Sequence, residues 1–389
     1  MRARERELRR RLGEQPLPGE VAAGARAWPL VAAALAGREP AARRRRLALS
    51  LAPALAAAVA ALVLVLTPAG PALGDWIESR FRAEPVPAAP AFAALPEGGR
   101  ALALSSTGAF VVRPDGSLRR VGAFSEAGWS PRGLHVVGVS GDRVVAVDPL
   151  GTPKWTVARP GRVSHPAWSA GDGFFVAYLE GASLRVVGGN GAGDRLLRRG
   201  VAAVTPAWRP GAGYALTYAR PRGIESVDAV SGARLWSRPA RRVVELAWGR
   251  DGARLAVLEP RRLRVLDRRG RLLRRVPLPP GARALALHRS GRRAAVLLQQ
   301  RRGARVVEVG LAGSTATASA ARTLFEGPGA VQGLEWSPDG SRLLVAWRDA
   351  DQWLLIGPDG RVRTLAQVSR ELGAGSGFPR LAGWCCVTH

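Results

Sequence analysis

Side chains that commonly carry enzyme chemistry are few in this 389-residue sequence and lie far apart. The four histidines are His135, His165, His288 and His389. They form no HExxH pattern and stand beside no cysteine at a metal-ligand spacing. No serine lies in a GxSxG nucleophile turn, and no glycine-rich phosphate loop is followed by a lysine. We therefore expect no catalytic residue, no metal site and no cofactor, and we expect the protein not to be an enzyme.

Three aspartates recur at the end of a predicted third strand of a repeated pattern. They are Asp148, Asp228 and Asp267. Acids at one repeat position could ring a cation, but each of these precedes a turn whose backbone N–H groups an aspartate side chain can satisfy. We expect these three side chains to stabilise turns.

Two cysteines, Cys385 and Cys386, are adjacent near the C-terminus. Neighbouring residues of an extended strand point to opposite faces, and a bond between them would demand a strained backbone. The sequence contains no CxxC motif. We expect two small, buried or half-buried hydrophobic side chains without a redox role.

Tryptophans mark the repeat. The repeated position is occupied by Trp129, Trp168, Trp208, Trp248, His288, Trp336 and Trp384, at intervals of 39, 40, 40, 40, 48 and 48 residues. A period of about forty residues is the length of one β-propeller blade. The tryptophans could form a ladder that stacks on glycans or bases, but their regular place in one strand of each unit indicates packing between blades.

Each unit reads as four short strands separated by turns. The unit at Trp336 is the clearest copy, with hairpin turns predicted at Asp339-Gly340 and Asp359-Gly360. The unit at Trp248 repeats this pattern with a turn at Asp251-Gly252. Four strands per period predict four-stranded antiparallel blades.

The two ends of the repeat predict how the ring closes. Three strand-like runs, at 101–106, 108–116 and 117–124, precede Trp129, and one run at 380–386 follows the sixth complete unit. Together these four runs make a seventh blade, and closure removes the exposed edges that an open array would leave. The sequence therefore predicts an all-β fold, a seven-bladed propeller closed by its own termini.

Several segments resemble known propeller families. WSPDG at 336–340, WSPRG at 129–133 and WSAGDG at 168–173 resemble the WD-type repeats of TolB-like propellers. The segments at 144–155 and 224–236 are similar to quinoprotein-type propeller repeats. The resemblance covers about residues 99–387. It implies a scaffold and no particular activity, because propellers host enzymes, receptors and docking platforms alike.

One unit departs from the pattern. It has His288 in the place of the tryptophan, and we assign to residues 303–321 an insertion rich in alanine, serine and threonine.

A membrane-length apolar run precedes the repeats. From Leu47 to Leu66 no residue is charged, and 20 helical residues span about 30 Å, the thickness of the hydrocarbon core. Arg43, Arg44, Arg45 and Arg46 stand directly before this run and hold the N-terminus in the cytoplasm by the positive-inside rule. A cleaved signal peptide, with a site near Ala72 and Gly74, is the alternative, but its leader would be far longer than an ordinary n-region.

The tail before the span has a charged helix-like segment and a second, more apolar one. Trp28, Leu30, Val31 and Leu35 would give the second helix an apolar face. So short a helix is marginal alone in water, which favours a partner: a protein, a second copy of the chain or the anionic inner leaflet. The alternative is a disordered tail that only fixes the topology.

The net charge is +28 and is carried by arginine, because Lys154 is the only lysine. We interpret this excess as spread rather than clustered on one face, and therefore expect no nucleic-acid partner. Doubled arginines fall mostly at turns and strand ends, at 241–242, 261–262, 268–269, 274–275, 292–293 and 301–302. If they line one mouth of the propeller, that mouth would attract an anionic envelope polymer or lipid head groups.

Four regions follow: a cytoplasmic tail at 1–46, a transmembrane helix at 47–67, a juxtamembrane helix and Pro/Ala-rich linker at 68–98, and the propeller at 99–389. The layout resembles transmembrane anti-sigma regulators, although the tail lacks a zinc-binding His and Cys pattern. We expect a single-pass bacterial cell-membrane protein whose extracytoplasmic propeller binds or senses something, with a protein partner for the tail. A passive envelope scaffold and an extracytoplasmic enzyme are the alternatives.

Overall fold

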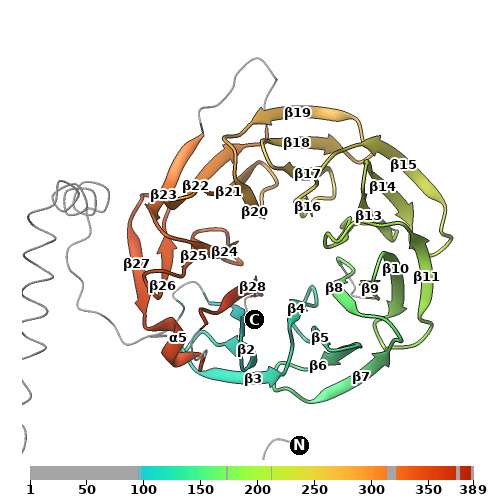
Figure 1. Ribbon diagram of the computed structural model, residues 1–389, viewed down its shortest axis with the longest axis horizontal. Helices are drawn as coiled ribbons and strands as arrows, with labels where there is room; N and C mark the ends of the chain where they lie inside the picture. The colour runs from blue at the N-terminus through green and yellow to red at the C-terminus, as the bar shows by residue number, and fades with distance from the viewer. Residues whose placement is uncertain are drawn as a thin grey trace, which may run out of the picture. The chain divides into compact units, whose positions relative to one another are not determined.

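The computed structural model describes residue 95 and residues 98–171, 174–211, 213–312, 321–373 and 377–386. These residues form seven four-stranded antiparallel sheets arranged in a ring (Figure 1). The predicted seven-bladed propeller is therefore confirmed. We call the strands of a blade A to D from the centre of the ring outward, and number the blades from the first complete repeat.

Every blade contributes four consecutive strands, apart from the one that joins the two chain ends. Blade 1 consists of β4 (Glu126–Trp129), β5 (Val136–Ser140), β6 (Arg143–Val147) and β7 (Pro153–Ala158). Blade 2 consists of β8 (Val163–Trp168), β9 (Phe175–Glu180), β10 (Ser183–Gly188) and β11 (Arg195–Arg199). Blade 3 consists of β12 (Ala207–Trp208), β13 (Ala215–Arg220), β14 (Gly223–Asp228) and β15 (Arg234–Pro239).

The remaining blades follow the same order. Blade 4 consists of β16 (Glu245–Trp248), β17 (Arg254–Glu259), β18 (Arg262–Asp267) and β19 (Leu272–Pro277). Blade 5 consists of β20 (Ala282–Leu287), β21 (Arg293–Gln299), β22 (Gly303–Gly310) and β23 (Arg322–Pro328). Blade 6 consists of β24 (Val331–Trp336), β25 (Leu343–Trp347), β26 (Gln352–Ile356) and β27 (Val362–Ala366).

Blade 7 closes the ring. Its A strand is β28 (Arg380–Cys385), and its other strands are β1 (Arg100–Ser105), β2 (Gly108–Val112) and β3 (Leu118–Gly122). The antiparallel register places Arg100 opposite Cys385 and Leu104 opposite Arg380. The predicted closure by three strands from one end and one from the other is confirmed.

The hydrophobic core is divided among the seven interfaces between blades. Seven buried clusters occur, and each combines side chains of two neighbouring blades. The B strand β17 illustrates the cause, because all its residues after Arg254 are buried. Middle strands contact a neighbour on both faces, so their sequences lack strict alternation of apolar and polar residues.

The predicted Asp-Gly turns are present. Gly252, Gly340 and Gly360 have φ values of 62°, 75° and 80°, the left-handed conformation that glycine adopts without steric cost. A Cβ atom on Gly340 would also lie 2.6 Å from Nε2 of His288, so this turn needs glycine for space as well.

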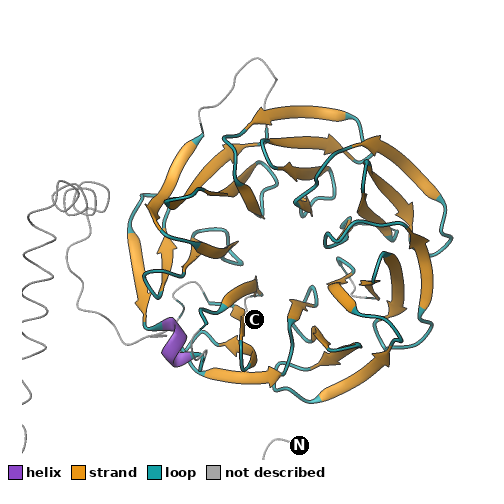
Figure 2. Ribbon diagram, in the orientation of Figure 1, coloured by secondary structure: helices purple, strands orange, loops and turns teal. Residues whose placement is uncertain are grey.

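The last two intervals of the repeat are longer than the others, at 48 residues each. The assigned insertion at 303–321 is wrong in its first half, because residues 303–310 form β22, the regular C strand of blade 5 (Figure 2). Its alternating buried and half-buried residues pair with both β21 and β23. Between blades 6 and 7, the short helix α5 (Val368–Glu371) lengthens the loop that leads to β28.

Candidate functional site

The strand order gives the propeller two distinct faces. In an antiparallel A-B-C-D blade, the A–B and C–D turns lie on one face, and the B–C turns and D–A loops lie on the other. Both ends of the described propeller lie on the first: Arg100 begins β1 opposite Cys385, the end of β28. We call the face of the A–B and C–D turns the terminal face, and the other the opposite face.

The repeat tryptophans lie at the ends of the inner strands, near the terminal face. The indole N–H of Trp208 donates to the Ala167 carbonyl of the preceding blade over 3.0 Å, and that of Trp336 donates to the Ala286 carbonyl over 3.2 Å. Trp168, Trp208 and Trp384 are buried, whereas Trp129, Trp248 and Trp336 are half-buried. These indoles join neighbouring blades, and burial and contacts occupy much of their surface.

A small cavity of about 160 Å³ lies at the ends of the inner strands on this face. Its walls include Trp248, Trp336, Trp384 and the carboxylate of Glu335. The ring of Trp336 is covered by the guanidinium of Arg293, 5.1 Å from its centroid. A cavity of this size holds several waters, each of which takes about 30 Å³ in the liquid. This recess has room for only a few waters, so the tryptophans do not form a surface on which sugar or base rings could stack.

Two glutamates of the inner strands have raised pKa values. Burial raises the pKa of Glu335 to about 7. Burial also raises the pKa of Glu245 to about 8; a hydrogen bond from the backbone N–H of Leu285 opposes this rise, and the charge of Glu335 adds to it. Burial therefore favours the neutral form of both side chains.

Inner-strand glutamates also hold neighbouring blades together. Glu245 accepts the backbone N–H of Leu285 over 2.7 Å, and Glu126 accepts that of His165 over 2.6 Å. His165 has a φ of 55° at an irregularity of β8, and this N–H points toward blade 1 and not along the β8–β9 ladder. These contacts give the glutamates a structural role.

The interpretation of the arginine excess as spread is wrong. Residues 241–302, from the loop before β16 to the B–C turn of blade 5, contain 18 arginines against four carboxylates. Their net charge of +14 is half of the +28 carried by the whole chain. Blades 4 and 5 are therefore a basic sector. The absence of a nucleic-acid partner, which was inferred from even spreading, stays a prediction.

The doubled arginines do not line one mouth, because the strand order divides them. The pairs at 241–242, 261–262 and 301–302 lie in D–A loops or B–C turns on the opposite face, whereas 268–269 and 292–293 lie on the terminal face. The pair at 274–275 lies within the outer strand β19. Sequence alone could not separate these positions, because turns of both faces alternate along the chain.

Turns of the opposite face form a continuous basic series in blades 3 to 5. We call the segments 220–222, 241–242, 260–262 and 300–302 the arginine turns. They contain eight arginines and no carboxylate, and all these arginines except Arg262 are exposed. The nearby Glu259 is only 2% exposed and is paired with Arg262 and, over 3.2 Å, with Arg264. It offsets the charge of Arg262, and Glu225 offsets that of Arg220, so the positive charge that the turns present to solvent comes mainly from the other six arginines.

A groove of about 540 Å³ begins at the first arginine turn. It is lined by Arg220 and Arg222 from the B–C turn and by Arg238 from β15. Glu225 lies in the same groove but accepts hydrogen bonds from Tyr218, over 2.5 Å, and from Arg220, over 2.9 Å. Burial opposes its ionisation, yet these hydrogen bonds outweigh burial and hold the pKa of Glu225 below its usual value. The groove can accept an anionic group.

The three repeated aspartates hold turns, as predicted. Asp148, Asp228 and Asp267 each accept two backbone N–H groups of the following C–D turn through one carboxylate oxygen. Hydrogen bonds from the Thr152 backbone N–H and from the Lys154 side chain lower the pKa of Asp148 to about 2. Within the described residues, no three side chains of His, Cys, Asp or Glu gather as a metal site would require.

The expectation of two unlinked cysteines is wrong, because Cys385 and Cys386 form a disulfide. Strand β28 ends at Cys385, and Cys386 adopts a left-handed φ of 50°, so the two side chains are not held on opposite faces. Both remain half-buried, as expected. The pair occupies the place that Ser-Pro takes after the tryptophan in the WSPxG repeats.

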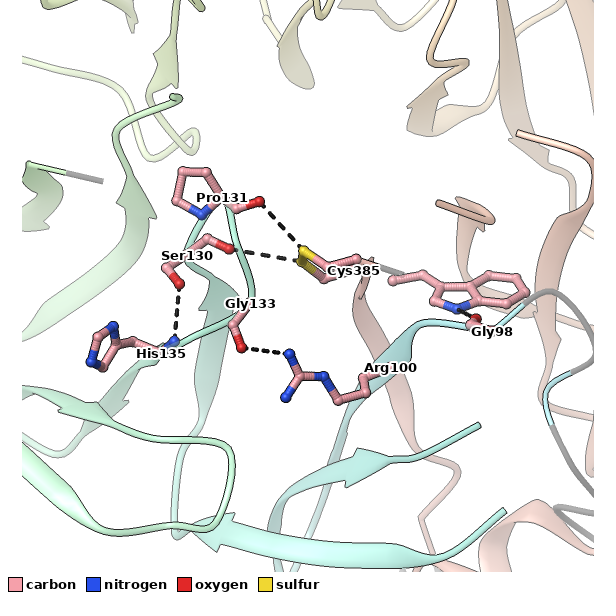
Figure 3. The surroundings of a disulfide bond; sticks show 9 residues. Gly98, Arg100, Ser130, Pro131, Gly133, His135 and Cys385 are labelled. Atoms are coloured by element: carbon pink, nitrogen blue, oxygen red, sulfur yellow. Dashed lines mark hydrogen bonds between the residues drawn. A yellow bond between two sulfur atoms is a disulfide. The ribbon is translucent and has the colours of Figure 1, made fainter. Parts of the chain in front are cut away.

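The disulfide packs against blade 1 at the seam of the ring (Figure 3). The sulfur atoms lie 3.8 Å from the Ser130 carbonyl oxygen and 3.4 Å from that of Pro131; without hydrogens, they make contacts there and do not donate. Arg100 donates to the Gly133 carbonyl over 2.7 Å, and a Cβ on Gly133 would come within 3.2 Å of both sulfurs. The linked cysteines thus complete the closure between blades 7 and 1.

The remaining predicted site residues lie outside the described part of the chain. They are Trp28, Leu30, Val31, Leu35, Arg43, Arg44, Arg45 and Arg46. In the part that the structure describes, none of the helices has the length and apolarity that a bilayer crossing requires.

Comparisons with known proteins support the fold. No protein-family model and no curated protein matches the chain. A functionally unknown protein from Desulfotomaculum acetoxidans matches with a TM-score of 0.55 and 11% identity, covering 73% of this chain and 99% of that one. Hsv2 of Kluyveromyces lactis matches with a TM-score of 0.51 and 13% identity, covering 69% and 94%. The β-propeller domain of Myceliophteria thermophila Cps50 (Swd1) matches with a TM-score of 0.50 and 15% identity, covering 63% and 86%.

At these identities the likeness shows the fold alone. The chain is a seven-bladed propeller with WD40-type structural neighbours. The TolB-like and quinoprotein-like resemblances, the bacterial origin and the membrane anchor stay predictions.

Proposed function

We propose that this protein is a membrane-anchored, extracytoplasmic binding scaffold whose propeller captures an acidic protein partner on the arginine turns of the opposite face. Two considerations support the proposal. β-Propellers commonly serve as protein-binding scaffolds, and a groove on the opposite face opens beside exposed arginines. The observation that carries the proposal is the series of eight arginines without a carboxylate in the turns of blades 3 to 5.

Arginine suits this role physically. Its planar guanidinium binds carboxylates through two parallel hydrogen bonds, and it is enriched among the residues that dominate binding energies at interfaces. A one-signed surface also accelerates encounter with an oppositely charged partner, in a manner that salt suppresses. The groove beside Arg222 adds a recess in which one acidic side chain would be partly desolvated, whereas Arg238 in its wall donates to the carbonyls of Ser237, Arg269 and Gly270.

A photo-crosslinking experiment in intact cells tests this surface. A photoreactive residue in place of Gln300, the first residue of one arginine turn, should yield one defined protein adduct. Arg222→Glu should weaken that adduct, and the double substitution Arg301→Glu with Arg302→Glu should abolish it. The matched control is Arg361→Glu, an exposed arginine in the C–D turn of blade 6, which should leave the adduct unchanged. An adduct that survives the double substitution would refute the arginine turns as the binding surface.

An anionic envelope polymer is the second candidate occupant, favoured by the same charge pattern. A polymer would give heterogeneous adducts of graded size instead of one protein band. Its binding would also fall smoothly with salt, because each arginine contact releases counterions from the polymer.

For the membrane anchor we propose a cytoplasmic N-terminus. The motivation is the four-arginine run before the uncharged 20-residue segment. Protease added to intact spheroplasts should degrade a C-terminal tag and spare an N-terminal one. A soluble secreted product that begins near Asp75 would support the cleaved signal peptide instead.

For the tail we propose a cytoplasmic regulatory partner, such as a sigma factor, that covers Trp28, Leu30, Val31 and Leu35. The tail is too small to form its own core, so a partner is needed to order it. A crosslinker at Trp28 should capture a specific soluble protein, and Leu35→Glu should remove that product. Crosslinks to lipid alone would favour the passive scaffold, and turnover in a substrate screen on the purified chain would favour the enzyme.

A further inference from the structure

Exposed apolar side chains are confined to one face of the propeller. Among the described residues, eight large hydrophobic side chains are exposed: Leu134, Leu150, Phe174, Leu196, Val230, Leu235, Leu272 and Leu273. Each lies in an A–B turn, in a C–D turn or within the first two residues of a D strand, so all eight backbone positions lie at the end of the blade nearest the terminal face, although the neighbours Leu272 and Leu273 point to opposite sides of β19. We call these eight side chains the apolar rim.

The apolar rim is also confined to one arc of the ring. Two of its side chains come from each of blades 1, 2, 3 and 4, and none comes from the described parts of blades 5 to 7. The exposure is large, at 63% for Phe174 and 59% for Leu134, so these side chains do not belong to the core. Two exposed apolar side chains in each of four consecutive blades indicate a binding surface.

Arginines stand next to these leucines on the outer strands. Three consecutive blades carry the same short motif around the start of the D strand, with the sequences Arg195-Leu196-Leu197, Arg234-Leu235-Trp236 and Arg271-Leu272-Leu273. In each case the leucine that follows the arginine is exposed. The arc therefore carries an arginine and an exposed leucine at each of three strand starts, although neighbouring side chains of a strand point to opposite sides of it.

The charge on this arc is positive. In the terminal-face turns and D-strand starts of blades 1 to 4, the exposed described cations are Arg132, Lys154, Arg234, Arg250, Arg268, Arg269 and Arg271. The one fully exposed carboxylate among the described residues of these segments is Asp251. The turn aspartates are only partly exposed and accept N–H groups of their own turns. The arc thus combines apolar tips with a net positive surface.

A basic cavity lies within this arc. About 400 Å³ in volume, it is bounded by Leu235 and Trp236 of β15, by Arg268 and Arg269 of the next C–D turn, and by Arg209. Three arginines and two apolar residues in one lining match a phosphate that carries hydrocarbon, since arginine binds phosphate through two parallel hydrogen bonds. A purely polar polyanion would gain no binding energy from the apolar residues of this lining.

The chain enters the propeller on this same face. The backbone N–H of Leu95 donates to the Pro114 carbonyl in the C–D turn of blade 7 over 2.8 Å, and β1 starts at Arg100. Between the end of the predicted span, Leu66, and Leu95 lie 28 residues, which extend at most about 90 Å. A linker of this length that joins the propeller at the terminal face leaves that face free to reach the bilayer.

We propose that the apolar rim docks the propeller onto the anionic lipid headgroup layer of the membrane in which the chain is anchored. Apolar tips beside arginines are the combination that interfacial binding uses, with the apolar groups inserted about 5–10 Å and the cations at the phosphates. The terminal face then lies on the membrane, and the arginine turns of the opposite face point away from it toward a partner. This inference rests on the membrane anchor of the proposed function.

Fluorescence quenching in nanodiscs tests the docking with the full chain. A fluorophore on Leu150→Cys reports the terminal face, and one on Gln300→Cys reports the opposite face; the disulfide-bonded Cys385 and Cys386 do not react with maleimide without reductant. Discs contain either phosphatidylcholine alone or about one third phosphatidylglycerol, each with a nitroxide on the lipid headgroup. We expect quenching at position 150 that strengthens with phosphatidylglycerol, and no quenching at position 300 in either disc.

Substitutions in the rim should remove this signal. Replacing Arg268 and Arg269 by glutamate should lower the ratio of docked to undocked chains by at least about 25-fold, since each arginine near an anionic surface contributes about fivefold. Leu235→Asp with Leu272→Asp should also abolish quenching at position 150. The matched control is Thr364→Asp, an exposed position on the outer strand β27 of blade 6, which should leave quenching unchanged. All of these positions are exposed, and far-UV circular dichroism verifies that each variant keeps its fold.

The outcomes separate the inference from the proposed function. A chain that fails to co-elute with phosphatidylcholine discs has no membrane anchor, which overturns both. A chain that co-elutes but shows no quenching at position 150 in anionic discs overturns the docking alone. Equal quenching at positions 150 and 300, or quenching that survives both sets of rim substitutions, likewise overturns it.

Discussion

The tryptophan of the closing strand offers the sharpest test of how the ring is held. Trp384 lies on β28, which pairs with β1 alone and joins the two chain ends. Its side chain is only 8% exposed, and its indole N–H donates to the Gly98 carbonyl over 3.1 Å. A tryptophan buries about 150–250 Å², worth about 4–6 kcal/mol of transfer free energy as an upper limit.

We expect Trp384→Ala to lower the free energy of unfolding by about 3–5 kcal/mol, the usual cost of removing a buried aromatic side chain. Trp384→Phe keeps most of the apolar contact and loses the hydrogen bond, so it should cost about 1–2 kcal/mol. Urea unfolding of the full chain in detergent, followed by far-UV circular dichroism, measures both. Trp336→Ala is the matched control, because Trp336 holds the equivalent place in blade 6 but is half-buried and away from the closure.

Deletion of residues 380–389 extends this test. It removes β28, leaves blade 7 with three strands and exposes the edge of β1. The truncated chain should aggregate or lose its cooperative transition. A loss below about 1 kcal/mol for Trp384→Ala, or a truncated chain that unfolds like the intact one, would refute closure through β28 as a source of stability.

Three further predictions concern an inner-strand glutamate, a turn and the disulfide. The folded pKa of Glu335, about 7, lies above its ordinary 4.5, so its ionisation lowers the stability of the fold as pH rises from 4.5 to about 7. Glu335→Gln should therefore raise the urea midpoint at pH 8 and leave it nearly unchanged at pH 4, and an equal effect at both would contradict the shift. Asp228→Ala should cost about 1 kcal/mol in thermal or urea unfolding, and Asp228→Asn less, because the amide oxygen can still accept the turn N–H groups. The unreduced protein should show no free thiol, and Cys385→Ser with Cys386→Ser should change the free energy of unfolding by under about 1 kcal/mol, because a bond between adjacent residues closes almost no loop in the unfolded chain; a much larger loss would show that the disulfide itself holds the seam.

Local patterns determined much of this fold because they act over a few residues. The spacing of the tryptophans fixed the blade count, since each indole repeats one place in one strand and the run lengths leave room for four strands per period. Asp-Gly turns such as Asp339-Gly340 were predictable because a left-handed turn position favours glycine whatever surrounds it. Asp148 and its two counterparts were predictable for the same reason, because each bonds its own turn.

Tertiary structure alone decided two features of this protein: which turns share a face of the propeller, and how the chain bends at its ends. Successive turns alternate between the two faces, so adjacent arginine pairs such as 261–262 and 268–269 separate in space, and exposed leucines far apart in sequence gather on one rim. The disulfide was not predicted because both cysteines were expected in an extended strand, whose neighbouring side chains point apart. In the structure, Cys386 adopts a left-handed conformation at the end of β28, and the bond can form. Sequence periodicity thus specified the blades and their number, whereas the surfaces available for binding emerged only when antiparallel strands and ring closure brought distant turns together.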